Sequence, residues 1–230
     1  MPSRRVFVDT SVVHHSVRAV SRVTRRDLYS AGDTTAIRSG FWLEITTPDP
    51  AESVVGTRLH TEIEAIGRVV ELRRSGVIEL VWNVETHLEY LRQVPSGFFG
   101  YSVAELLAAG IEYVDAPIRY FRSGPIVPAL DGSGESPRDE QLRFLRGLKQ
   151  QRFLELQRAT GANQGARVVD RQLLDAFHLW CAEHASSEFF LTTDFKLINH
   201  VRRTKRRPPK VTVVGPSELL AAVTAEVAGG

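Results

Sequence analysis

The sequence contains a single cysteine, Cys181, among its 230 residues. One cysteine excludes an intrachain disulfide and most structural zinc sites, and it fits a reducing compartment. No apolar run approaches the ~18 residues that a membrane span requires, and no N-terminal apolar stretch is long enough for a signal peptide. These absences predict a cytoplasmic chain with no membrane segment.

The net charge is also small, with a formal value of +2 at pH 7. The distribution of charge is more informative than its sum. The stretch VRRTKRRPPK concentrates five basic side chains, Arg202, Arg203, Lys205, Arg206 and Arg207. Such a run would suit a nucleic-acid backbone, which it would bind without reading its sequence. The alternative is a solvated charged loop.

No internal repeat is present, and apolar runs alternate with helical patterns along the chain. Period and flanking residues predict strands at 6–8, 77–83, 111–116, 188–194 and 210–214. They predict helices at 11–20, 61–76, 84–92, 103–109, 168–186 and 216–227, and one long amphipathic segment at 138–159 whose apolar face either meets a partner or covers a sheet. This alternation predicts an α/β fold with a parallel sheet flanked by helices, although the strand order cannot be read.

Acidic residues follow two of the predicted strands. Asp9 ends VFVD and Asp194 ends FFLTTD, so both are expected at the carboxyl edge of a parallel sheet. A helix cap is the simpler interpretation of Asp9, and a strand-ending turn that of Asp194. Asp175 lies near the front of the helix that precedes the Asp194 strand, and Glu89 lies on the helix after the second strand.

Several carboxylates at one place repel one another unless a cation compensates their charge. Mg²⁺ and Mn²⁺ prefer oxygen ligands, and such a site can activate a water molecule to attack a phosphodiester. The acids therefore predict a Mg²⁺ or Mn²⁺ centre.

Four stretches together resemble a PIN domain: VFVDTSVV, WNVETHLEY, LLDAFHLWCAEHASSEFFLTTD and VTVVGPSELL. The resemblance implies a three-layer α/β/α fold with a central, mostly parallel sheet, in a family of metal-dependent ribonucleases that includes many toxins of toxin–antitoxin pairs. It implies that Asp9, Glu89, Asp175 and Asp194 are the catalytic and metal-binding residues, and that Ser11, Thr192 and Asn199 support them.

We therefore expect a single PIN-like domain over residues 1–230, with insertions at about 21–58 and 95–165. The expected activity is metal-dependent cleavage of RNA. An antitoxin-like protein partner and a homo-oligomer are left open. Glu85 is a substitute for Glu89 as ligand, since the two share one helix face, although a first-turn glutamate favoured by the helix dipole is the simpler interpretation of Glu85.

Other functions and other residue roles are compatible with parts of the same pattern. A PIN-fold module that binds nucleic acid or protein with little or no catalysis is the main alternative. A haloacid-dehalogenase phosphatase would need a second Asp where this chain has Ser11. Adjacent His14 and His15 point apart on a helix, which disfavours a metal site. His178 is expected to be a core histidine with its hydrogen bonds satisfied.

Overall fold

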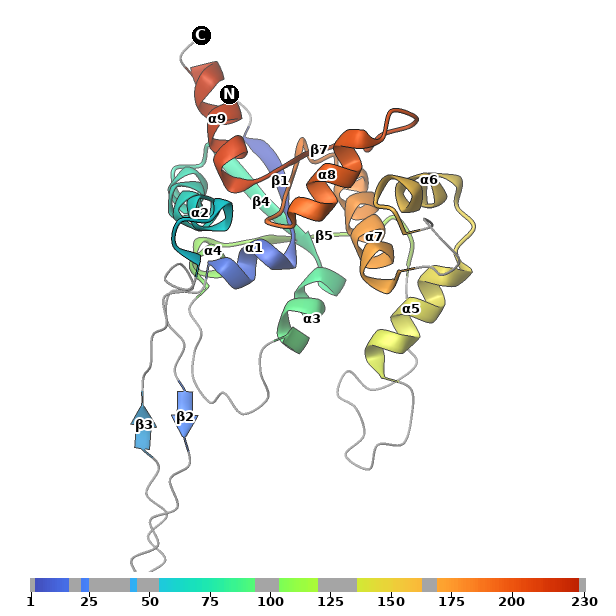
Figure 1. Cartoon of the computed structure of the whole chain (residues 1–230), viewed down its shortest axis with the longest axis horizontal. Helices are drawn as coiled ribbons and strands as arrows, with labels where there is room; N and C mark the ends of the chain where they lie inside the picture. The colour runs from blue at the N-terminus through green and yellow to red at the C-terminus, as the bar shows by residue number, and fades with distance from the viewer. Residues whose placement is uncertain are drawn as a thin grey trace, which may run out of the picture.

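The computed structural model describes residues 3–16, 22–24, 42–44, 54–93, 104–119, 136–162 and 169–227. Its centre is a five-stranded sheet in the order β5-β4-β1-β6-β7, with every neighbouring pair parallel (Figure 1). In that order the strands are Glu112–Val114, Ile78–Asn83, Arg4–Val8, Phe189–Leu191 and Thr212–Val214. The expected α/β class with a parallel sheet is therefore confirmed.

Both faces of the central strands are buried, since successive strand residues point to opposite sides and most of them are apolar. Val6 and Val8 of β1 pack on one face and Phe7 packs on the other. The Phe7 ring stacks on that of Phe190 in β6, with 5.6 Å between centroids. Each such side chain, fully buried, contributes roughly 1.5–3 kcal/mol to folding.

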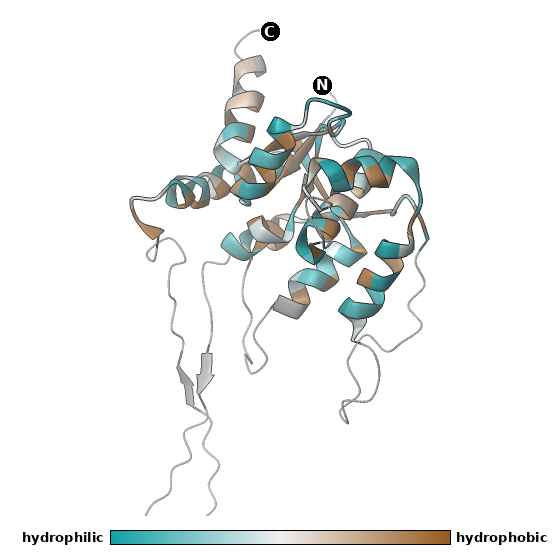
Figure 2. Ribbon diagram, turned by 45° about the vertical axis from the view of Figure 1, so that its right-hand side comes forward, coloured by the Kyte–Doolittle hydropathy of each residue, from teal (hydrophilic) through white to brown (hydrophobic). Residues whose placement is uncertain are grey.

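Helices cover the two faces and make three layers. One apolar cluster joins the sheet to α1 (Thr10–His15), α2 (Arg58–Arg74), α4 (Glu105–Ala109) and α9 (Pro216–Val227). The other joins it to α5 (Pro137–Gly147), α6 (Gln151–Ala159), α7 (Asp170–His184) and α8 (Phe195–Arg203). Figure 2 shows the apolar sides of these helices turned toward the sheet and their polar sides turned outward. The helix α3 (Val84–Gln93) continues directly from β4.

Several predicted boundaries differ from the structure. The helix expected at 11–20 ends at His15, and residues 17–20 lie outside the described part. The segment expected at 138–159 is two helices, since Leu148 leaves the helical conformation and α6 begins at Gln151. Its apolar face covers the sheet. The helix α8 was not predicted at all.

The two segments expected as insertions contain regular structure. Within 21–58, β2 (Arg22–Thr24) and β3 (Trp42–Glu44) pair antiparallel, and most other residues of the segment lie outside the described part. Within 95–165, β5 is an edge strand of the central sheet. Among the described residues, no helix combines the length and the apolar character that crossing a bilayer would require.

Candidate acidic site

The topology brings the first two predicted acids together. The central strand β1 lies between β4, which is the next strand of this sheet along the chain, and β6. In open parallel sheets, ligands bind at the carboxyl ends of strands where the connections diverge in this way. Asp9 directly follows β1, and its backbone N–H donates to the carbonyl of Leu191, the last residue of β6 (3.0 Å). Asp194 lies three residues further along the chain.

Asp9 occupies the N-cap position of α1, but its side chain makes no capping hydrogen bond. Its Oδ2 instead accepts hydrogen bonds from the hydroxyls of Ser11 (2.6 Å) and Thr192 (2.7 Å). Burial raises the pKa of the Asp9 carboxyl, but the nearby His178 and the two hydroxyls outweigh burial and lower it. Asp9 is thus a buried, ionised carboxylate, and helix capping does not explain it.

The two hydroxyls are themselves fixed by backbone groups. Thr192 Oγ1 accepts from the N–H of Asp194 (3.0 Å), and Ser11 Oγ accepts from the N–H of Thr193 (3.2 Å). Because each hydroxyl accepts from the backbone, its proton is directed to Asp9. The structure therefore places Ser11 and Thr192 where the sequence predicted supporting hydroxyls.

Asp194 caps α8 with one oxygen and forms an ion pair with the other. Its Oδ1 accepts from the N–H groups of Lys196 (2.8 Å) and Leu197 (3.1 Å). Its Oδ2 accepts from Arg171 (2.6 Å). The Arg171 side chain is 69% exposed, so solvent screens this ion pair and its contribution to stability is small.

Asp175 is half-buried and accepts no hydrogen bond from any described residue. Burial, and then the negative charges of Asp9 and Asp194, raise the pKa of its carboxyl well above the ordinary value. The nearby cations His178 and Arg171 reduce this effect without cancelling it. Asp175 is therefore a member of the cluster whose ionisation the surroundings disfavour.

His178 lies between the acids of different elements. Its Nδ1 is 3.9 Å from Asp9 Oδ1, and its Nε2 is 3.6 Å from Glu89 Oε2. Burial lowers the pKa of the imidazole, but Asp9, Glu89 and Asp175 outweigh burial and raise it. Neither ring nitrogen has a hydrogen-bond partner among the described residues, so the expectation of a satisfied core histidine was wrong.

Glu85 and Glu89 share a face of α3, as their spacing predicted, but they differ in burial. Glu89 is partly exposed and approaches His178, whereas Glu85 is 5% exposed and lies near the Cys181 thiol. Asn83 caps this helix, accepting from the N–H of Glu85 (2.9 Å). Glu89 is therefore the better placed of the two for the acidic site.

Three of the four predicted acids, Asp9, Glu89 and Asp175, lie around His178. In the part of the chain that the structure describes, no three His, Cys, Asp or Glu side chains converge closely enough to hold a metal ion. The donor set nevertheless suits Mg²⁺ or Mn²⁺, because it consists of carboxylate oxygens supported by hydroxyls. A divalent cation would also offset the burial and the negative charges that raise the pKa of the Asp175 carboxyl.

The sequence analysis missed three contributors to this site. Arg171 pairs with Asp194. In the sequence, the one indication that Arg171 lies near the acids is its position four residues before Asp175 on the same helix. His178 also follows Asp175 by three residues, and His15 bonds Thr193 Oγ1 through Nδ1 (2.8 Å). His14 points elsewhere and lies against the Tyr90 ring.

Asn199 and the basic run lie away from the acids. Asn199 is exposed on α8, and its side chain makes no hydrogen bond or ion pair with any described residue. Arg202 pairs with Glu218 (2.6 Å) and Arg207 with Glu155. Residues 204–211 lead into the amino end of β7, whereas Asp9 and Asp194 follow the carboxyl ends of their strands. The basic run is therefore at the opposite edge of the sheet.

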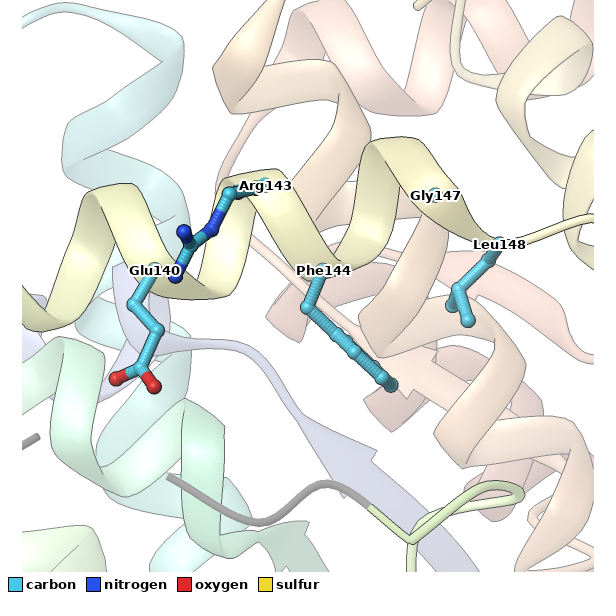
Figure 3. Close-up of a pocket in the computed structure, with 5 residues that line it drawn as sticks. All are labelled: Glu140, Arg143, Phe144, Gly147 and Leu148. Atoms are coloured by element: carbon cyan, nitrogen blue, oxygen red, sulfur yellow. The ribbon is translucent and has the colours of Figure 1, made fainter. Parts of the chain in front are cut away.

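A separate pocket of about 400 Å³ lies along α5 and contains none of the predicted site residues. Figure 3 shows Glu140, Phe144 and Leu148 leaving the helix on the same side. The exposed lining of this pocket is mostly apolar, and it comes from α5 and the residue after it. The pocket therefore offers few polar groups to orient a ligand. The acidic cluster is the stronger candidate.

The chain matches no protein-family model, and no curated protein matches it in sequence. A functional conclusion for this chain therefore depends on its own residues.

Proposed function

We propose that this chain is a metal-dependent endoribonuclease with a PIN-like fold, and that the acidic cluster is its active site. Asp9, Glu89, Asp175 and Asp194 would hold Mg²⁺ or Mn²⁺. Bound there, the cation would supply charge compensation for the scissile phosphate and a more acidic water molecule.

The environment of Asp9 carries this proposal. A carboxylate kept ionised in a buried position is costly unless its surroundings are arranged to favour the charge. Ser11 and Thr192 both donate to Oδ2, which leaves Oδ1 directed toward His178 and the interior of the cluster. A purely structural aspartate at this N-cap would bond to the helix instead.

The other residues have distinct roles in the proposed site. Asp175 would offer the cation a carboxylate that accepts no hydrogen bond from a described residue. Asp194 would offer its Oδ2 once Arg171 moves into solvent. His178 would balance the charge of Asp9 and Glu89 when no cation is bound. Ser11 and Thr192 orient Asp9 and take no part in proton transfer.

RNA as the substrate, a cytoplasmic location and a protein inhibitor are predictions from the sequence. The PIN-like resemblance supports RNA, and the single cysteine supports a reducing compartment. An antitoxin-like partner and a homo-oligomer remain open predictions.

Cleavage by the variant Asp9→Asn tests the proposal. Asparagine keeps an oxygen for the two hydroxyls but loses the charge, so the fold should persist while several kcal/mol of charge stabilisation is lost. Cleavage of RNA should fall by about a hundredfold or more. Undiminished metal-dependent cleavage by the variant would remove Asp9 from the reaction.

A second candidate function is a binding module on the same fold. The positions of Arg171 on Asp194 and of His178 between Asp9 and Glu89 favour it, because these cations already compensate three of the acids. RNA binding without metal-dependent cleavage by the folded wild-type protein would select this function.

A further inference from the structure

A basic pocket of about 610 Å³ lies between α6 and the loop that follows α8. In Figure 1 this loop leaves α8 at the upper right, beside α6. The lining contains four cations and a single carboxylate, so its net charge is strongly positive. The residues are Gln151, Glu155, Arg158, Thr204, Lys205, Arg206 and Arg207.

Three of the four cations in the pocket have side chains with no partner in the described part of the chain. Arg158, Lys205 and Arg206 are exposed, and none makes a hydrogen bond or ion pair through its side chain with another described residue. Arg207 alone is neutralised, by Glu155. Three unpaired cations around one opening form a site for an anion with several oxygens, such as a phosphate group.

The pocket is built on a fixed framework. Arg152 bonds Glu155 (3.1 Å), Glu183 and the carbonyl of Pro208 (2.9 Å), which ties the loop to α6 and α7. The N–H of Lys210 donates to Glu183 (2.8 Å). Arg207 has a left-handed backbone conformation with φ of 54°, which a non-glycine residue keeps only where its surroundings hold it.

The outer face of α8 connects this pocket to the acidic cluster. Leu197, Ile198 and Val201 face the core, and the opposite stripe consists of Lys196, Asn199 and Arg203, spaced three and four apart. All three are exposed and make no hydrogen bond or ion pair through their side chains with described residues. This stripe starts beside Asp194, which caps the helix, and ends at Thr204 in the pocket.

The length of α8 suits a nucleic-acid strand. Its nine residues span about 14 Å, the length of about four stacked nucleotides at ~3.4 Å each. A strand cut at the acids would therefore reach the pocket with several phosphates still on the protein.

We propose that RNA is held along the outer face of α8, with its backbone phosphates bound in the pocket by Arg158, Lys205 and Arg206. This inference rests on the proposed function for the identity of the ligand. It adds a binding surface at the edge of the sheet opposite to the cleavage site. Contacts to phosphate alone predict binding that does not depend on base sequence.

The test is the binding of an end-labelled single-stranded RNA of mixed sequence, measured by fluorescence anisotropy over a series of salt concentrations. EDTA is present throughout, so that binding is read without cleavage. For the triple variant Arg158→Gln, Lys205→Gln, Arg206→Gln, the slope of log K against log salt should be shallower by about 2. Affinity near 0.1 M salt should fall by about ten- to a hundredfold.

A charge-matched control is Arg68→Gln, Arg74→Gln, Arg138→Gln, which removes three cations from α2 and α5. Its slope and affinity should stay near wild type. Equal losses in the two variants, or no RNA binding by the wild type, would overturn the binding surface. Intact binding with no cleavage in Mg²⁺ or Mn²⁺ would instead contradict the proposed nuclease and leave this surface standing.

Discussion

At the residue scale, the chemistry of Asp9 is set by what donates to it. The Thr192 hydroxyl is fully buried, donates to Asp9 Oδ2 and accepts from the N–H of Asp194. One hydroxyl therefore links the two acids that follow neighbouring strands. Because the carboxylate is buried, each donor has a large effect on its charge.

Thr192→Val removes this link while keeping the shape of the side chain. Asp9 loses a donor and the N–H of Asp194 loses its acceptor, which should destabilise the fold by about 1–3 kcal/mol. The pKa of Asp9 should rise, and metal-dependent cleavage should fall. Urea unfolding, NMR titration of the carboxyl and the cleavage assay measure the three effects.

Thr212→Val is the matched control, because Thr212 is exposed on β7. It should change neither stability nor cleavage beyond a few tenths of a kcal/mol. A Thr192→Val protein indistinguishable from this control would mean that the hydroxyl does not position Asp9.

Glu155 gives a prediction about pH. Hydrogen bonds from Gln151 and then Arg207, with Arg152 adding to them, lower the pKa of its carboxyl from 4.5 to about 2. Its contribution to stability is therefore complete above pH 4.5 and is lost as the pH falls toward 2. Glu155→Gln should make stability less dependent on pH in that window.

Thermal unfolding of wild type and Glu155→Gln between pH 6 and the acid range measures this difference, with exposed Glu71→Gln as the control. Identical pH profiles for Glu155→Gln and wild type would contradict the assigned contacts.

At the element scale, Glu62 of α2 holds the start of α9. Its carboxylate is 3% exposed and accepts from the backbone N–H (2.8 Å) and the hydroxyl (2.9 Å) of Ser217. The negative charge also complements the positive end of the α9 dipole. Gly215 permits this approach, because a Cβ there would lie 2.9 Å from Glu62 Oε2.

Glu62→Ala should lower the free energy of unfolding by about 1.5–3 kcal/mol, since it leaves the first turn of α9 without its charged acceptor. Chemical denaturation provides the measurement, and Glu71→Ala on the exposed side of α2 is the control. Equal stabilities for the two variants would show that Glu62 does not hold α9.

The elements also show what local patterns could predict. The helix starting at Pro216 and the alternation of strands and helices followed from nearby residues. The helix α8 was not predicted, because the basic residues at its end suggested a charged loop. Leu197, Ile198 and Val201 nevertheless have helical spacing. The break between α5 and α6 was not predicted either, because no proline lies between the two helices.

At the scale of the whole molecule, the order of the strands brings together the acids of the proposed site. The pairing of β1 with both β4 and β6 joins residues more than 70 and 180 positions apart, and no local pattern encodes it. The sequence placed Asp9 and Asp194 at one edge of a sheet, and the structure makes their strands neighbours. The sequence alone could not reveal that His178 lies between Asp9 and Glu89, because these three residues belong to different elements.

The same topology separates charges of opposite sign. The acids follow the carboxyl ends of β1 and β6, while the basic pocket lies at the amino end of β7. A nearly neutral chain can therefore present an acidic edge and a basic edge, with α8 running between them. In the proposed function, this separation would let one strand of RNA contact both edges.

Cleavage of a mixed pool of single-stranded and structured RNA by wild type and Asp194→Asn, in Mg²⁺, Mn²⁺ or EDTA, tests the central claim most directly. Asparagine caps a helix as well as aspartate does, so α8 should remain intact while the charge is removed. We predict metal-dependent cleavage by the wild type and by Glu71→Gln, and none by Asp194→Asn. Cleavage that persists in EDTA or in the folded Asp194→Asn protein would contradict the account.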